Sequence, residues 1–540
     1  MITAQKHVDN MSEIMSDSRP RIIMRILQIL LINFVLSNHV CLTKGQMQPS
    51  YKAIAKQIKW MRAEDIAKQY GEKPVFFQDG PTRFDINQGR LGDCWFLATL
   101  ADLPSRPALF NKVVDPTQSF EKNPSGIFRF NFWQDGEWIE VTVNDYLPTL
   151  DGKLFFASSD SPNEFWSALL EKAYAKLYGN YKALSGGLIA ESLEDLTGGV
   201  TESFSSTYDI GPPTPSFEAL LKAYQEGALL AFGVRGSKRY TPPEDLHIAT
   251  KSNAIEELKQ QKYDTIKKDK STFQDPLFPQ SLTSIGNLGF FGTPFDPDPD
   301  VSQEGLVGSH VYAITKVVEI EIQGLKHQLV RLYNPFGNQA EWTGAWSDNA
   351  DEWNALTDKE KSDIGFVNDG ADGEFFMSYQ DLENNSDWID VSHVSFAGWH
   401  KHEILGSWTG PKNPHYILVE FEDQDTDSKD TISCLVSLVL TGGRRREAEG
   451  LENNASTHFF VVNITDEKLP LSEERIRKAK RILDSYWLPF RSNTERFEVQ
   501  ATGRYIIVPE TDSAHSEFLL RVFSEIPFTL ELIDSIQMVP

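Results

Sequence analysis

The sequence predicts an α+β fold arranged as two lobes, followed by an all-β sandwich. Apolar residues recur at helical spacing after Cys94 and again over residues 164–174. Strand-type alternation lies between these two stretches, and short strand patterns recur at regular intervals beyond residue 393. At 540 residues the chain is too long for one hydrophobic core, so several domains are expected.

Residues 1–72 form a predicted N-terminal extension without a catalytic pattern. Within it, residues 21–42 resemble a signal segment, because basic residues flank an apolar run of about 11 residues. A helix that crosses a bilayer needs about 20 residues, so this run does not predict a membrane span. If the segment targets the protein, we expect a secreted or membrane-associated protein; otherwise we expect a cytoplasmic one.

The first lobe is predicted over residues 73–198. Residues 126–133 and 138–143 alternate as strands do, and the residues between them are typical of a hairpin turn. The helical spacing of residues 164–174 predicts a helix with Asn163 as its N-cap.

The second lobe is predicted over residues 199–395, after a hinge at Gly198 and Gly199, where no side chain restrains the backbone. Residues from about 236 to 304 are charged and Pro-rich and are interpreted as an insertion. A strand is expected to begin just after His310, and a second strand over residues 329–333 precedes Asn334.

The sandwich is predicted over residues 396–540, where strand patterns are short and regularly spaced. Its expected strands are residues 416–422, 433–440, 458–463, 505–508 and 517–523.

Charge and cysteine content limit the functions that this chain can have. Asp and Glu total 77 against 52 for Lys and Arg, a formal net charge of −25. Such an acidic balance argues against a nucleic-acid partner and favours cation binding. Three cysteines do not make a disulfide framework, which fits a reducing compartment such as the cytoplasm.

Cys94 follows a Gly-rich turn and precedes the apolar run of a predicted helix. A thiol at a helix N-terminus has its pKa lowered, to roughly 3.5–7.5 where a histidine also lies beside it. Gln88 lies six positions upstream and could donate its side-chain amide to an oxyanion. The alternative is a buried structural cysteine, because free cysteine often behaves as a small core residue.

A cysteine nucleophile needs a base and a residue that orients this base. His310 would hold the thiol proton and later give it to the leaving amine, and Asn334 would fix the histidine tautomer. Position alone does not select His310 among the eleven histidines of the chain.

Several separated motifs together resemble the calpain family of cysteine proteases over about residues 70–395. The resemblance implies a two-lobed, papain-like core and a calcium-dependent endopeptidase that makes limited cuts in protein substrates. It makes Cys94 the nucleophile, His310 the acid and base, Asn334 the orienting residue and Gln88 an oxyanion donor. The motifs are residues 88–98, 126–134, 136–138, 163–176, 184–187, 308–312, 334–337, 341–348 and 372–375.

The resemblance also implies two calcium ions, one on each lobe, whose binding brings the lobes together. Carboxylate and carbonyl oxygens are the ligands that calcium prefers, whereas acidic turns are otherwise usually only solvated surface. The implied ligands of the first ion are Asp85 and Glu164, with the carbonyls of Gln78 and Gly80. Those of the second ion are Glu341, Asp348, Asp372 and Glu374, with the carbonyl of Gly370.

The sequence departs from the family pattern near the expected site. Phe336 stands where calpains usually carry Trp, although Phe can still exclude water by its bulk. One residue is added between Gly337 and Glu341, and the insertion before Gly305 has no counterpart in the common pattern. The alternative is therefore a catalytically inactive calpain-like protein that binds calcium, phospholipid or protein. A transglutaminase fits less well because its third partner would be Asp rather than Asn334.

The region after residue 396 resembles the β-sandwich that follows the calpain core, which implies peripheral phospholipid contact. No EF-hand loop pattern occurs in the chain, so no EF-hand small subunit is expected as a partner.

Overall fold

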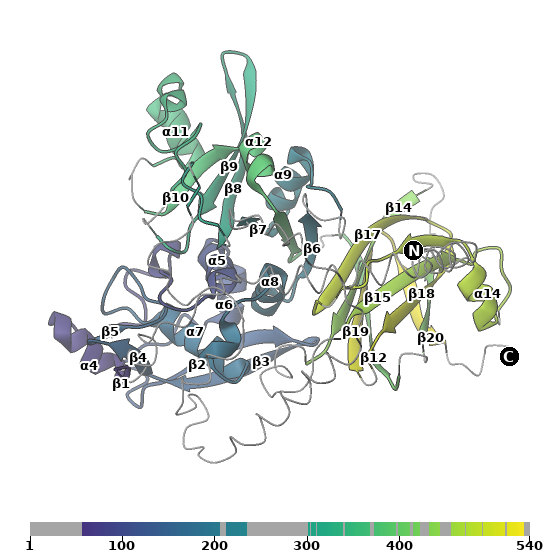
Figure 1. The fold of residues 1–540 in the computed structure, drawn as a ribbon, viewed down its shortest axis with the longest axis horizontal. Coiled ribbons are helices and arrows are strands. Elements are labelled where there is room, and N and C mark those ends of the chain that lie inside the picture. Colours follow the sequence, from purple (N-terminus) through teal and green to yellow (C-terminus); the bar gives the residue numbers. More distant parts are fainter. Residues whose placement is uncertain are drawn as a thin grey trace, which may run out of the picture.

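A computed structural model gives three successive blocks, which Figure 1 shows in purple to blue, in teal to green, and in green to yellow. The signal-like segment 21–42, nearly all of the predicted insertion, and Gly370 lie outside the described residues. Among the helices of the described residues, none is both long enough and apolar enough to cross a bilayer. The structure describes residues 57–205, 212–234, 301–302, 304–308, 310–337, 341–367, 372–395, 398–410, 414–421, 431–442, 455–469, 471–488, 490–513 and 516–533.

Lobe one is a helical core covered by two small antiparallel sheets. Its elements are β1 (Lys59–Arg62), α4 (Ala63–Ala67), η1 (Lys68–Tyr70), η2 (Arg83–Asp85), α5 (Cys94–Asp102), η3 (Leu103–Ser105), α6 (Pro107–Val113), β2 (Ile127–Gln134), β3 (Glu137–Asn144), β4 (Tyr146–Leu150), β5 (Lys153–Leu154), α7 (Trp166–Leu177), η4 (Tyr181–Leu184) and α8 (Ile189–Thr197). The predicted hairpin is β2 paired with β3, and Asp135 and Gly136 adopt positive φ in its turn. Phe96 of α5 stacks on Tyr174 of α7 with ring centroids 4.1 Å apart, which joins the two central helices.

Two local predictions for lobe one need correction. The lobe starts before the predicted boundary at residue 72, because β1 pairs with β4 and α4 buries its apolar face in the core. The prediction that Asn163 caps α7 is wrong, since the helix begins at Trp166 and Asn163 donates to the Lys73 carbonyl. The bridge between Val75 and Glu164 instead fixes this segment just before the helix.

Lobe two is built on one antiparallel sheet of six strands in the order β10-β9-β8-β7-β11-β6. Its elements are β6 (Val200–Ser205), α9 (Phe217–Gln225), β7 (Leu229–Val234), β8 (His310–Ile322), β9 (Leu325–Tyr333), η6 (Asp351–Ala355), α11 (Asp358–Ile364), β10 (Glu374–Ser378), α12 (Tyr379–Asn385) and β11 (Trp388–His393). β8 begins at His310 itself, one residue earlier than predicted, and β9 ends immediately before Asn334 as predicted.

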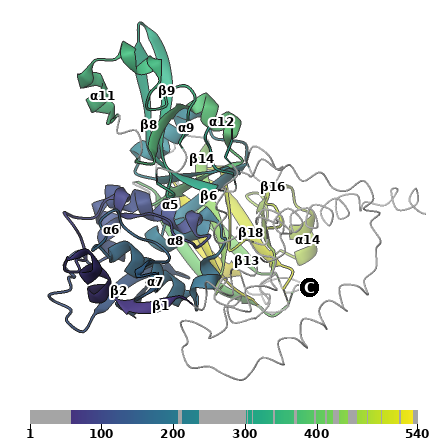
Figure 2. The same ribbon diagram turned by 60° about the vertical axis from the view of Figure 1, so that its left-hand side comes forward.

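The two faces of this sheet pack against different partners. Leu230 and Ile314 face the cluster formed with α9 and α12, whereas their neighbours Ala231 and Ala313 join the core of lobe one. These alanines are 1% exposed, and α5 packs directly against β7 and β8. Small side chains on this face therefore let the helix that carries Cys94 approach the strand that begins at His310 (Figure 2).

The third block is a β-sandwich of a four-stranded sheet, in the order β12-β19-β14-β17, and a five-stranded sheet, in the order β16-β15-β18-β13-β20. Its elements are β12 (His400–Trp408), β13 (Tyr416–Phe421), β14 (Thr431–Leu440), β15 (Thr457–Asn463), α14 (Glu473–Lys478), β16 (Arg481–Asp484), β17 (Ser492–Gln500), β18 (Arg504–Thr511), β19 (Ser516–Ser524) and β20 (Phe528–Ile533). Apolar residues from both sheets, such as Val436 and Phe459, fill the space between them. The five predicted strands are all present, and the fold class is α+β as predicted.

Candidate active site

Cys94 occupies the first position of α5, as the sequence predicted. Its side chain is partly exposed, whereas the eight residues that follow it are buried. The apolar run therefore anchors the helix in the core and leaves its N-terminus at the surface of lobe one. The dipole of α5 favours negative charge at this end, which suits a thiolate.

His310 and Asn334 meet at the adjoining ends of β8 and β9. The Nε2 atom of His310 lies 2.8 Å from Oδ1 of Asn334, and both residues are buried. The same Oδ1 accepts a hydrogen bond from the backbone N–H of Phe336 at 3.0 Å, which fixes the orientation of the amide. Neutral His310 therefore carries its proton on Nε2 and leaves the Nδ1 lone pair available as a base.

Phe336 covers the histidine in the way that the family Trp was expected to. Its ring is stacked on the imidazole of His310, with centroids 4.3 Å apart and an interplanar angle of 5°. Tyr312 lies edge to face with His310, with ring centroids 5.1 Å apart, and also interacts electrostatically with Cys94. An aromatic cover is thus present despite the substitution, and a second ring contacts His310 edge to face.

Burial governs the protonation of His310. Desolvation lowers the pKa of its imidazole from 6.5 to about 4, and the hydrogen bond with Asn334 acts in the opposite direction. A neutral imidazole is therefore the resting form when no negative charge lies beside it. A thiolate at Cys94 would favour the imidazolium, so ionisation of the two groups is coupled.

Gln88 lies where the two lobes touch. Its backbone N–H donates to the Pro335 carbonyl at 2.8 Å, so the loop before Cys94 is bonded to the loop after Asn334. Its side-chain Nε2 donates to the Leu91 carbonyl at 2.6 Å, which leaves the second hydrogen of that amide for an oxyanion.

A pair of buried carboxyl groups lies behind the nucleophile, and sequence reasoning missed it. Asp93 is the N-cap residue of α5, Glu171 belongs to α7, and both side chains are excluded from solvent. Burial raises the pKa of Asp93 to about 7, and burial together with the charge of Asp93 raises the pKa of Glu171. Burial therefore favours the protonated form of both groups, and no spacing rule relates residues on separate helices.

Asp85 and Glu164 converge in lobe one, as the first calcium prediction requires. They interact through their carboxyl groups, and burial raises the pKa of Glu164 to about 7. The Gln78 N–H donates to Glu164 at 2.6 Å, and Gly80 follows it at a φ of 96°. Two adjoining carboxylates are ligands that suit a hard cation, whereas the contact shown at Gln78 is through its N–H, so the carbonyls of Gln78 and Gly80 stay predicted ligands.

The predicted second set is only partly gathered. Glu341 accepts from the Gly373 N–H at 2.8 Å, and burial followed by the charge of Asp372 raises the pKa of Glu341. Glu374 instead pairs with Arg83 and Arg331, so its place among the ligands stays a prediction. In the described part of the chain, no three His, Cys, Asp or Glu side chains are grouped as a metal site.

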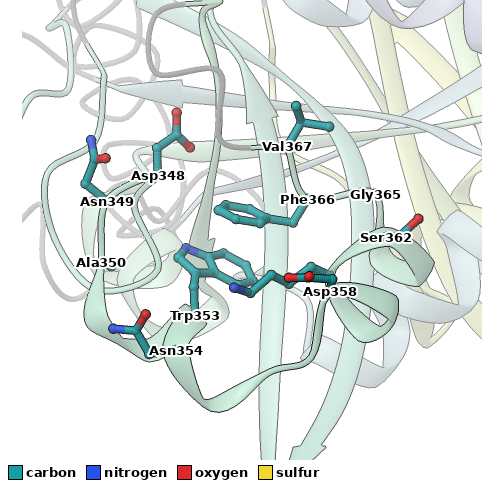
Figure 3. Close-up of a pocket in the computed structure, with 11 residues that line it drawn as sticks. Asp348, Asn349, Ala350, Trp353, Asn354, Asp358, Ser362, Gly365, Phe366 and Val367 are labelled. Carbon is teal, nitrogen blue, oxygen red and sulfur yellow. The ribbon is translucent and has the colours of Figure 1, made fainter.

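Asp348 lies at the wall of an open cavity of about 500 Å³ on lobe two. Figure 3 shows its carboxylate above the stacked rings of Trp353 and Phe366, whose centroids are 3.8 Å apart. Asp358 and Lys361 also line the cavity, so its lining carries both signs of charge.

The ion pair between Arg83 and Glu374 joins the two lobes and was not predicted. Arg83 precedes Asp85 by two residues, and Glu374 follows Asp372 by two, so the pair connects the two candidate calcium regions. Partners 291 positions apart leave no local signal in a single sequence.

The sequence was also compared with known protein families. The sequence profile of the calpain family cysteine proteases matches residues 37–393. The chain belongs to the calpain family. A second profile, that of domain III of the calpain large subunit, matches residues 398–523, which hold most of the β-sandwich.

Individual calpains match most of this chain. Calpain-B of Drosophila melanogaster is 32% identical over 508 residues, which cover 86% of this chain and 47% of that protein. The calpain-2 catalytic subunit of Mus musculus is 32% identical over 519 residues, which cover 90% of this chain and 64% of that protein. The chain therefore spans less than two thirds of the length of these calpains.

Proposed function

We propose that this chain is a calcium-dependent cysteine endopeptidase that makes limited cuts in protein substrates. The observation that carries the proposal is the buried pair of His310 and Asn334, set at the start of the strand against which the Cys94 helix packs. Membership of the calpain family supports the same reaction class.

The geometry supports acyl transfer through the Cys94 thiol. His310 Nδ1 takes the thiol proton, and the sulfur attacks the scissile carbonyl carbon while Asn334 holds the resulting imidazolium. The Gln88 side-chain amide donates a hydrogen bond to the oxyanion of the tetrahedral intermediate, and the positive end of the α5 dipole stabilises the same charge. The C–N bond then breaks as His310 protonates the leaving amine, and a thioester remains. Water, deprotonated by His310, hydrolyses the thioester and regenerates the thiol.

Calcium would be held by Asp85 and Glu164 in lobe one, and by Glu341 and Asp372 in lobe two. When bound, it would supply the positive charge that keeps these carboxylates ionised. The residues themselves hold loops on both sides of the active site, because Gly373 donates to Glu341 and accepts from the N–H of Asn334. Ordering of the Gly373 loop would therefore also order the residue that orients His310.

An inactive calpain-like protein is less consistent with the site. The substitution at Phe336 was the main motive for that alternative, yet the Phe ring lies flat on His310. A reducing, cytoplasmic location would keep the Cys94 thiol unoxidised and fits the low cysteine content. Protein substrates, and peripheral phospholipid contact through the sandwich, belong to the same proposal.

The proposal is tested with an unfolded protein substrate, with calcium or with a chelator. We expect fragments only with calcium and none from Cys94→Ser. Cys434→Ser is the matched control, because that thiol is buried in the sandwich, where burial raises its pKa to about 12, and its replacement should leave cleavage intact. A wild type that yields no calcium-dependent fragments would contradict the proposal.

Calcium binding is tested separately by calorimetry and by tryptophan fluorescence. Trp166 donates its indole N–H to Asp85 at 3.1 Å, so its emission should respond to an ion at the first position. We expect Glu164→Gln to remove one binding event and Asp372→Ala to remove the other. Glu137→Gln, on the exposed hairpin, should bind as the wild type does. Cleavage that survives Asp372→Ala unchanged would reject the second position.

A further inference from the structure

The hinge between the lobes lies against the β-sandwich. Gly198 ends α8 at a φ of 68°, a conformation that L side chains rarely adopt. At Gly199, a Cβ atom would lie 2.8 Å from the carbonyl oxygen of His393, so the hinge chain passes close to β11. Both glycines are therefore fixed by their surroundings, and their carbonyl groups face β19 of the sandwich.

Arg521 of β19 binds this hinge directly. Its Nη1 donates to the Gly199 carbonyl at 2.6 Å, and its Nη2 donates to the Gly198 carbonyl at 2.8 Å. Its Nε donates to Glu403 of β12 at 2.9 Å, which orients the guanidinium from within the sandwich. The guanidinium also lies 4.6 Å from the ring centre of Trp133 in lobe one. With its side chain 3% exposed, Arg521 is a buried connection between the sandwich and the hinge.

Ion pairs extend this connection to both lobes. On the side of lobe one, Arg491 pairs with Asp195 of α8, and both side chains are almost fully buried. On the side of lobe two, Arg496 of β17 binds Glu202 of β6 through both carboxylate oxygens, at 3.0 and 2.7 Å. The strands β17 and β6 lie side by side (Figure 1). Removal of either partner from the buried Arg491–Asp195 pair would leave an uncompensated charge, whereas the Arg496 side chain is 33% exposed and its pair with Glu202 contributes less.

Apolar contacts flank the arginines on the same face of the sandwich. Trp133 of lobe one packs with Val439 and Leu519. Val200 of lobe two packs with Leu435 and Phe523. The four-stranded sheet therefore holds a residue of each lobe in an apolar cluster, with Arg521 on the hinge between them.

We propose that the β-sandwich sets the relative orientation of the two catalytic lobes, with Arg521 as the positioning residue that holds the hinge. This inference rests on the proposed function, because it assigns to Arg521 the alignment of Cys94 with His310. A small rotation at the hinge moves the base relative to the sulfur, and a misplacement of about 1 Å can cost roughly 100-fold in rate. Arg521 touches no reacting atom and acts only through the backbone that joins the lobes.

The test compares Arg521→Gln with Arg504→Gln in the full-length chain. Arg504 is the matched control, because it also donates to backbone carbonyls, at Thr465 and Glu467, but in the other sheet of the sandwich. Peptide hydrolysis gives kcat and KM, and mass spectrometry of the Cys94 peptide gives the rate of its alkylation by iodoacetamide at pH 7. We expect Arg521→Gln to lower kcat and the alkylation rate by about tenfold or more, with KM changed less than about threefold.

The control separates alignment from stability. Arg504→Gln should lower the Tm while Cys94 keeps its alkylation rate, and Arg521→Lys should recover part of the loss because it keeps the charge and one carbonyl contact. Wild-type alkylation and kcat in Arg521→Gln, or an equal loss in Arg504→Gln, would overturn the inference. If Arg521→Gln does not fold, Arg521→Lys is the test variant. We then expect an intermediate loss of kcat and of the alkylation rate, and no loss in this variant would contradict the inference. A wild type that cleaves nothing would defeat the proposed function, whereas the alkylation rates would still decide the role of Arg521.

Discussion

The stack of Phe336 on His310 predicts how the base responds when its cover is removed. Burial lowers the pKa of His310 from 6.5 to about 4, which is a change of about 2.5 units. Phe336 covers one face of the imidazole, and Tyr312 contributes at its edge. If Phe336→Ala restores somewhat less than half of the lost hydration, the pKa of His310 should rise by about 1 unit.

The measurement is an NMR titration of the His310 ring in a Cys94→Ser background, where no thiolate contributes. The signal is assigned by its loss in His310→Gln. Phe336→Trp is the control, because an indole restores the apolar cover and should leave the pKa near its wild-type value. If the pKa stays near 4 or falls in Phe336→Ala, burial of His310 comes from other walls and the assigned role of Phe336 is refuted.

The same change should slow catalysis for a separate reason. A stacked aromatic pair contributes about 0.5–1.5 kcal/mol beyond its buried area, and its loss lets the imidazole leave the orientation set by Asn334. In the active Cys94 enzyme, kcat/KM for Phe336→Ala should therefore fall by about 2- to 13-fold. Phe336→Trp should retain the wild-type value, and an unchanged value in Phe336→Ala would contradict the argument.

Three further changes test groups around the site. Asn334→Ala removes a hydrogen bond that raises the pKa of His310. A hydrogen bond to a charged group is worth about 1.5–3 kcal/mol, so its loss in the transition state should lower kcat/KM for peptide hydrolysis by about 10- to 150-fold. Burial raises the pKa of Asp93 to about 7, so the folded protein is more stable when this group is protonated. Relative to Asp93→Asn, the free energy of unfolding of the wild type should therefore fall by up to about 4 kcal/mol as pH rises from about 4 to 7. Urea unfolding at several pH values measures this difference. Despite burial, His393 and Arg496 lower the pKa of Glu202 to about 2. The ionised carboxylate therefore contributes up to about 3 kcal/mol to the free energy of unfolding, and this contribution should be lost as pH falls from about 4.5 toward 2. Glu202→Gln should lack this acid-dependent loss in thermal unfolding, and an unchanged pH dependence would refute the assignment.

The strands of the sandwich show which features a single sequence reveals. The five predicted strands are β13, β14, β15, β18 and β19, and each lies inside its sheet. The four that were missed, β12, β16, β17 and β20, are the outer strands of the two sheets. Interior strands are buried on both sides and are rich in apolar residues, whereas edge strands carry charges that limit pairing with other chains. β17, with the sequence SNTERFEVQ, has the polar composition of an exposed segment.

The sequence likewise reveals some features of the active site and not others. The helix at Cys94 has a local apolar pattern and was predicted from it, although it begins at Cys94 itself, one residue before the predicted run. His310 and Asn334 were selected only through the family motifs, because nothing local distinguishes His310 from the other histidines. The contacts that were missed, Arg83 with Glu374 and Arg521 with the hinge, join residues about 300 positions apart. Such contacts depend on the tertiary fold, which local spacing does not determine.

Alignment of the catalytic groups is a packing property as much as a matter of calcium or charge. α5 belongs to the core of lobe one, yet its outer side rests on Ala231 and Ala313 of the lobe-two sheet. A larger side chain at either alanine would move the helix away from β8, because a close-packed interface does not compress. The proposed cation positions and the sandwich would act on loops and on the predicted hinge, whereas these alanines limit how closely the Cys94 helix approaches β8. Any signal that orients the lobes can therefore align Cys94 with His310 only as well as this interface allows.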